Sequence, residues 1–91
     1  AANLMVLAAA HKFDAGEECG VEANSAKYLA AEAGYFACET AIMSMGGMGY
    51  AKEYHVERLL REVMITRIAP VSEQMILSFI AEKVLDLPKS Y

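Results

Sequence analysis

The sequence predicts an all-α protein in which residues 1–91 form a single domain, a bundle of helices. Apolar residues recur three and four positions apart along most of the chain, the spacing that places them on one face of a helix. No stretch alternates apolar and polar residues as a half-buried β-strand would. Glycine and proline interrupt the helical pattern in a few places, and these divide the chain into four expected helices.

The first two expected helices are rich in alanine. Residues 1–15 carry Leu4, Leu7 and His11 at helical spacing, and Gly16 ends this helix because glycine tolerates the left-handed conformation of a helix cap. Residues 16–20 then form a short polar turn. The second helix spans about residues 23–45, with an apolar stripe of residues spaced four and three apart: Leu29, Ala33, Phe36, Thr40 and Met43.

Three glycines at positions 46, 47 and 49 predict a loop after the second helix, since glycine loses the most backbone entropy on becoming helical. The third helix runs from about Val56 to Ala69 and stops before Pro70, which disfavours helical geometry in the preceding residue. Ser72 can cap the fourth helix, with Glu73 in its first turn. The stripe of that helix comprises Met75, Ile76, Phe79, Ile80 and Val84, and the tail 87–91 resembles a finished C-terminus.

The composition has an apolar surplus for so short a chain. Hydrophobic residues make up 56 % of the sequence, compared with roughly 45–50 % in average chains. We interpret the surplus as faces that pack against other parts of a larger protein or against sister subunits, because contiguous apolar patches usually mark interfaces. The start at Ala1, without an initiator Met, agrees with this interpretation. The alternative is simply an apolar four-helix domain.

Charge and hydropathy argue against several classes of partner. A net charge of −4 and a pI near 5.1 disfavour a nucleic-acid surface, which needs clustered Lys and Arg to neutralise phosphates. No apolar run approaches the roughly 18 residues of a membrane span, so none is expected. Without a signal peptide, the chain is expected to be cytoplasmic, and Cys19 and Cys38 to be free thiols.

The glycine-rich segment is the most distinctive candidate for chemistry, because closely spaced glycines let a backbone approach a phosphate or a ring. It is neither a P-loop nor a dinucleotide-binding fingerprint, since no Lys-Ser or Lys-Thr follows it and a helix precedes it. A tight turn between helices is an equally good interpretation. No metal site is expected, because His11 and His55 have no partners at ligand spacing. Glu17, Glu18 and Glu22 are typical of an acidic helix start.

Residues 45–62 resemble a long signature of the acyl-CoA dehydrogenases. That signature reads G-G-x-G-Y, then a short charged stretch, V-E-R and an R-[DE] pair. This chain matches it in order with residues 46–50, 56–58 and 61–62. Upstream, residues 16–31 look like the turn and helix that precede the glycine loop in this family. The resemblance therefore covers essentially the whole chain.

The resemblance implies a flavoenzyme of three domains whose C-terminal four-helix bundle also builds the core of a dimer or tetramer. This chain resembles most of that bundle and is expected to be inactive alone. The family reaction uses FAD to oxidise an acyl-CoA thioester to a 2-enoyl-CoA, with a carboxylate base that removes the α-proton. The implied partners are therefore FAD, an acyl-CoA, an electron acceptor and further copies of the chain.

The resemblance also implies roles for four residues. Gly46 and Gly47 correspond to the element that contacts the adenosine and pyrophosphate of FAD bound mainly by a neighbouring subunit. Ser72 and Gln74 correspond to polar residues that meet the cofactor after the third helix. These four residues form the expected cofactor-binding set.

Two departures from the family pattern keep other functions open. Pro70 stands where common members have their glutamate base, so no catalytic residue is expected in this chain. Some members place the base on an earlier helix, which here would precede Ala1. Met43 replaces a FAD-binding Gln that is frequent in the family. The alternatives are a non-catalytic helical oligomerisation module of the same fold, and a flavin enzyme that acts on another substrate.

Overall fold

The computed structural model describes residues 1–89, and the regular structure within them is helical. No strand occurs in that range, which confirms the predicted all-α class. Ser90 and Tyr91 of the predicted tail lie outside the described residues. The elements are α1 (Ala2–Asp14), α2 (Gly20–Met45), α3 (Gly47–Tyr50), the 3-10 turn η1 (Lys52–Tyr54), α4 (Val56–Ile68) and α5 (Glu73–Lys83).

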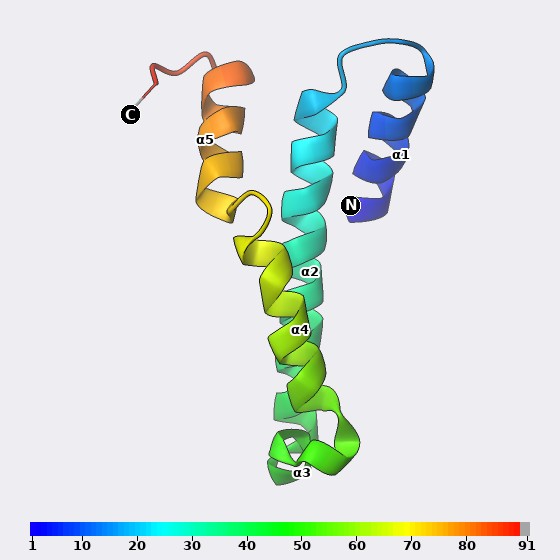
Figure 1. The fold of residues 1–91 in the computed structure, drawn as a ribbon, viewed down its shortest axis with the longest axis vertical. Coiled ribbons are helices and arrows are strands. Elements are labelled where there is room, and N and C mark those ends of the chain that lie inside the picture. Colours follow the sequence, from blue (N-terminus) through cyan, green and yellow to red (C-terminus); the bar gives the residue numbers. More distant parts are fainter. Residues whose placement is uncertain (90–91) are drawn as a thin grey trace.

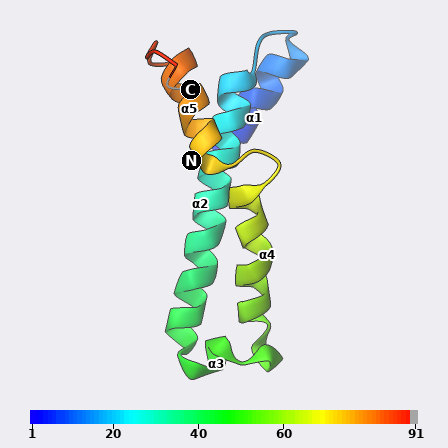
Figure 2. The ribbon, with the colours of Figure 1, turned by 60° about the vertical axis from the view of Figure 1, so that its left-hand side comes forward.

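Helix α2 is the central helix of the fold, and the other long helices pack against it (Figure 1). Helix α1 runs antiparallel beside the N-terminal half of α2, and α4 runs antiparallel beside its C-terminal half. Helix α5 lies beside the N-terminal half on the side opposite α1, as the view turned by 60° also shows (Figure 2). At the far end, α3 and η1 lead the chain from α2 into α4.

Small residues, rather than the expected apolar stripe, bring α2 close to its neighbours. Ala26 and Ala31 are buried, and a Cβ added at Gly34 would stand 2.8 Å from Cγ2 of Val63 in α4. Phe36 of the expected stripe is instead 68 % exposed. Small side chains allow the helix backbones to approach one another, so the bulky stripe of α2 faces outward from this chain.

The predicted helix ends follow the glycine and polar signals, with one shift. Gly16 ends α1 as predicted and has a φ of +73°. Helix α2 begins at Gly20, before the expected start near Ala23. Glu22 in its first turn bonds to Lys12 of α1 at 2.5 Å, and a negative charge near a helix N-terminus is stabilising. This contact extends the helix into the expected turn.

The prediction of a loop directly after α2 is wrong in part, because residues 47–50 form the helical turn α3. Gly46 reverses the chain with a φ of +57°. Gly49 then lies against the backbone of α2, where an added Cβ would stand 2.6 Å from the carbonyl oxygen of Ile42. This close packing, which only glycine permits, offsets the backbone entropy that the helical glycines lose.

The chain has a small core and a large surface. Its accessible surface is 6528 Å², compared with about 5,200 Å² expected for a compact monomer of this mass. The radius of gyration is 16.2 Å, compared with about 12 Å for a compact domain of this length. The predicted apolar surplus therefore lies mostly on the outside. Largely exposed apolar side chains include Leu4, Phe13, Phe36, Met43 and Ile68.

One stretch, Val56–Lys83, is long and apolar enough to cross a membrane by length and composition alone. It spans 28 residues and reaches a mean hydropathy of 1.3. It consists of two helices, α4 and α5, which are separated by residues 69–72, and Arg67 forms ion pairs within and beside it. This stretch is therefore only weak evidence for a membrane span.

Candidate functional site

The turn between α4 and α5 carries two of the four predicted cofactor residues. Pro70 follows a cis peptide bond from Ala69, and α4 ends before it as predicted. Ser72 caps α5, because its Oγ accepts a hydrogen bond from the backbone N–H of Met75 at 3.4 Å. Gln74 lies in the first turn of α5 and is exposed. The structure thus brings Ser72 and Gln74 together at the start of one helix.

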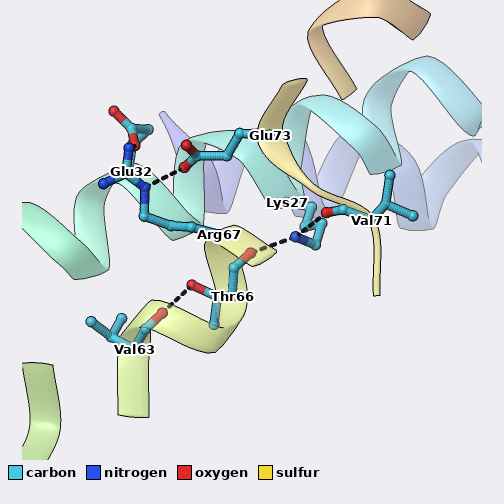
Figure 3. Close-up of polar contacts among 7 residues, drawn as sticks. All are labelled: Lys27, Glu32, Val63, Thr66, Arg67, Val71 and Glu73. Carbon is cyan, nitrogen blue, oxygen red and sulfur yellow. Dashed lines mark hydrogen bonds and ion pairs between the residues drawn. The ribbon is translucent and has the colours of Figure 1, made fainter. Parts of the chain in front are cut away.

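Lys27 of α2 binds the backbone on both sides of this turn. Its Nζ donates to the carbonyl oxygens of Thr66 at 2.5 Å and Val71 at 2.9 Å (Figure 3). Thr66 lies in the last turn of α4, where carbonyl groups lack partners within the helix. A positive charge at this position complements the negative end of the helix dipole.

Arg67 is the centre of a charged cluster that joins three helices. Its Nε donates to Glu73 Oε1 at 2.7 Å, and its Nη2 lies 2.9 Å from Glu32 Oε1 (Figure 3). The guanidinium also lies over the ring of Tyr35, 4.6 Å from its centre. Glu73 is only 8 % exposed, so its charge depends on these partners. The cluster fixes the start of α5 against α2 and α4.

The charged cluster changes the acidity of its members. The hydrogen bond from Arg67 lowers the pKa of the Glu73 carboxyl below its ordinary value of 4.5. The same bond raises the pKa of Arg67. Glu73 is therefore held as a carboxylate, which suits an ion pair and makes it a weak proton acceptor.

The other two predicted cofactor residues, Gly46 and Gly47, lie at the opposite end of α4. Both are exposed, and a Cβ added to either would meet no atom of the chain within 4 Å. At the same end of α4, residues of α2, α3, η1 and α4 line an open groove with a volume of about 370 Å³, and neither glycine is part of its lining. Its lining combines apolar and charged side chains: Ile42, Tyr50, Lys52, Glu57, Leu60 and Arg61.

The structure does not bring the two predicted pairs together. Helix α4 has 13 residues, which corresponds to about 20 Å of helix between the glycine turn and the turn that carries Ser72. Gly46 with Gly47, and Ser72 with Gln74, are therefore two separate surfaces. A ligand that touches both has to be long, or two ligands are involved.

Of the acidic residues predicted near the start of α2, Glu22 forms a contact between helices. Glu22 bonds to Lys12, which lowers the pKa of Glu22, and the same bond raises the pKa of Lys12. Within residues 1–89, no three His, Cys, Asp or Glu side chains converge as a metal ion would require. Cys19 and Cys38 are free thiols.

Sequence reasoning missed the residues that hold the α4–α5 turn. Lys27 binds Val71, which is 44 positions away in the sequence. Arg67 binds Glu73, which is six positions away. The signal that was present is local: Arg67 and Glu73 are opposite charges on either side of a proline. Lys27 carries no such signal, because its acceptors are backbone carbonyls that any residue provides.

Comparison with known proteins identifies similar sequences over nearly the whole chain. The family model "Acyl-CoA dehydrogenase, C-terminal domain" matches residues 1–85. Acyl-CoA dehydrogenase FadE12 of Mycobacterium tuberculosis is 46 % identical over 99 % of this chain, and the match covers 24 % of that protein. A 3-(aryl)acrylate reductase of Clostridium sporogenes is 46 % identical over 75 % of the chain and 18 % of its own length.

A mammalian protein is also similar to this chain. The mitochondrial short/branched chain specific acyl-CoA dehydrogenase of Rattus norvegicus is 36 % identical over 92 % of this chain, and the match covers 19 % of that protein. The chain thus spans about a quarter or less of the length of these relatives.

Proposed function

Because this chain belongs to the acyl-CoA dehydrogenase family and matches its C-terminal domain, we propose that it is part of an FAD-dependent enzyme that oxidises an acyl-CoA to a 2-enoyl-CoA. In this proposal, the chain contributes contacts to FAD and surfaces for subunit packing. FAD, when bound, accepts the hydride that leaves the β-carbon. Turnover would also require an electron acceptor to reoxidise the flavin.

The observation that carries the proposal is the open backbone at Gly46 and Gly47. No atom of this chain occupies the space beside either Cα, so a ligand can approach the main chain closely. The neighbouring groove offers apolar Ile42 and Leu60, against which an adenine ring can pack, and Lys52, which can attract a pyrophosphate. These groups fit the adenosine end of FAD.

The turn between α4 and α5 suits a second set of polar contacts. The Ser72 hydroxyl accepts a hydrogen bond from Met75 and keeps its own proton available to donate. Gln74 is exposed and presents an amide with both donor and acceptor atoms. We propose that Ser72 and Gln74 donate to FAD at this surface.

The proposed enzyme needs its catalytic base from elsewhere. Pro70 has no ionisable group, and the nearest carboxylate in sequence, Glu73, is bound to Arg67 at 2.7 Å and has a lowered pKa. A carboxylate so stabilised is a poor acceptor for the α-proton. We therefore place the base outside this chain, in the remainder of the full-length protein.

The exposed apolar side chains support the proposed role in packing. The surface exceeds that of a compact monomer, and it includes Leu4 and Phe13 of α1 and Ile68 of α4. Contact with other domains or with further copies of the protein would remove these side chains from water. We propose a homo-oligomer on this basis.

The test uses the full-length protein that contains this chain. Purified protein is expected to be yellow with bound FAD, and addition of an acyl-CoA without oxygen should bleach the flavin absorbance. The alternative, a non-catalytic oligomerisation module, is favoured by Pro70 and Met43, which replace the base and a flavin contact. A full-length protein that oligomerises but binds no flavin would overturn the enzyme proposal and support this alternative.

A further inference from the structure

Lys27 links the turn between α4 and α5 to the central helix α2 by hydrogen bonds. Its Nζ donates to the carbonyl of Thr66 in α4, and to the carbonyl of Val71, the residue directly before Ser72 (Figure 3). One ammonium group therefore fixes both ends of the turn on a helix that lies about 40 residues away in the sequence.

The other backbone hydrogen bonds of the turn stay within its flanking helices. The N–H of Ala69 donates to Ile65 at 2.8 Å, and the carbonyl of Ser72 accepts from Ile76 at 3.1 Å. These bonds end α4 and begin α5, but they do not relate the turn to α2. On one side of Ser72, the Arg67 cluster links Glu73 to Glu32 of α2, and on the other side Lys27 links the Val71 carbonyl to α2.

We propose that Lys27 is a positioning residue for the cofactor, which acts through the carbonyl of Val71 to fix the place of the Ser72 hydroxyl. The inference rests on the proposed contact between Ser72 and FAD. A hydrogen bond to a cofactor requires its atoms to lie within a few tenths of an ångström of the best geometry. Without the Lys27 bonds, the Arg67 cluster still holds Glu73, but residues 69–71 lose their link to α2, and Ser72 between them can shift beyond that tolerance.

Because the hydrogen bonds of Lys27 lie at the surface, the effect of their loss on FAD binding can be separated from the effect on the stability of the fold. Both hydrogen bonds of Lys27 are exposed to solvent. Water can therefore replace the ammonium group at the two carbonyls, and folding should lose little when it is removed. The position of Ser72 should nevertheless lose its restraint, so FAD binding should change more than thermal stability.

The experiment compares three variants of the full-length protein. Lys27→Met keeps the length of the side chain but removes the donors, Lys27→Arg keeps a cationic donor, and Lys83→Met is the matched control on an exposed lysine of α5. The dissociation constant of FAD is measured by titrating the apoprotein and following flavin fluorescence, and kcat and KM are measured with an acyl-CoA.

We expect Lys27→Met to weaken FAD binding by about tenfold, the effect of losing the one hydrogen bond that Ser72 is proposed to donate to FAD. It should also lower kcat at saturating FAD, with little change in KM for the acyl-CoA. Lys27→Arg should restore most of the affinity, and Lys83→Met should match the wild type. If Lys27→Met is insoluble, Lys27→Gln is measured by the same criteria.

A double-mutant cycle tests whether Lys27 acts through Ser72. In a Ser72→Ala background, Lys27→Met should have little further effect on FAD affinity, because the contact that it positions is already absent. Full additivity of the two changes, or an FAD affinity of Lys27→Met equal to wild type, would overturn the inference alone. A wild-type protein that binds no FAD would overturn the proposed function as well.

Discussion

Arg67 of α4 and Glu73 of α5 form an ion pair across the turn that carries Ser72, with 2.7 Å between Nε and Oε1. Glu32 of α2 meets the same guanidinium at 2.9 Å. One cation thus holds carboxylates from two other helices. The arrangement makes the turn a fixed part of the fold rather than a free connection.

This ion pair predicts that stability falls in acid. Arg67 lowers the pKa of Glu73 in the folded state, so the contribution of Glu73 is fully present above its unfolded pKa near 4.5. It is lost as the pH falls through the lower folded-state pKa. Glu22, whose pKa is lowered by Lys12, adds a loss of the same sign.

Thermal unfolding of the chain, followed by circular dichroism from pH 7 to pH 3, measures this loss. Glu73→Gln should lower the midpoint at pH 7 and flatten the decline in acid. Glu39→Gln, at an exposed position of α2, is the matched control and should leave the curve unchanged. Parallel curves for wild type and Glu73→Gln would show that the ion pair does not govern the acid response.

The glycine turn predicts opposite outcomes for two Gly→Ala changes. A methyl group at Gly49 would stand 2.6 Å from the Ile42 carbonyl oxygen, whereas at Gly47 it meets open space. Gly49→Ala should therefore destabilise the chain by about 1 to 3 kcal/mol, the usual effect of overpacking. Gly47→Ala should be close to neutral. Urea unfolding at one fixed protein concentration compares them, and equal midpoints would contradict the close packing of α3 on α2.

Gly47→Ala also tests the proposed cofactor surface separately from stability. If FAD lies against the open backbone, the added methyl group should weaken its binding to the full-length protein by about tenfold, or about 1.4 kcal/mol. Gly20→Ala is the matched control, because its Cβ would make an ordinary contact of 3.6 Å with Phe79, away from the glycine turn. Unchanged FAD affinity in Gly47→Ala would remove this residue from the cofactor surface.

The packing of α5 depends on Ile76, the one large side chain among the described residues that is fully buried. Ile76→Ala should reduce the free energy of unfolding by about 2 to 5 kcal/mol, because it removes buried methyl groups and leaves a cavity. Leu77→Ala, at a neighbouring position that is 47 % exposed, should have an effect of about 1 kcal/mol or less. Denaturant unfolding of the two variants checks this difference.

Local signals in the sequence were sufficient to predict most helix ends. Gly16, Pro70 and Ser72 act on their own backbone or on residues a few positions away, so their effects can be inferred without the rest of the fold. The turn α3 could not be predicted in this way. It depends on the contact of Gly49 with Ile42, which the entropy of glycine alone argues against.

The candidate site likewise contains residues that could be identified from the sequence and contacts that could not. Gly46, Gly47, Ser72 and Gln74 were identified by resemblance to a family, and sequence alone did not place them about 20 Å apart along α4. Lys27 was missed because a side chain that binds distant backbone carbonyls leaves no pattern in the sequence. The ion pair of Arg67 with Glu32 likewise joins helices whose packing depends on Gly34 and Val63.

The large accessible surface, with its many exposed apolar side chains, predicts how the isolated chain should behave. At 6528 Å², the surface exceeds the value of about 5,200 Å² for a compact monomer of this mass, and association would bury part of the excess. The 91-residue chain should therefore be helical and oligomeric, and it should carry no FAD because it presents only two separate parts of the proposed cofactor surface. Light scattering after gel filtration measures the mass, and the visible absorbance of flavin measures bound cofactor. A monomer with stoichiometric FAD would contradict both parts of this prediction.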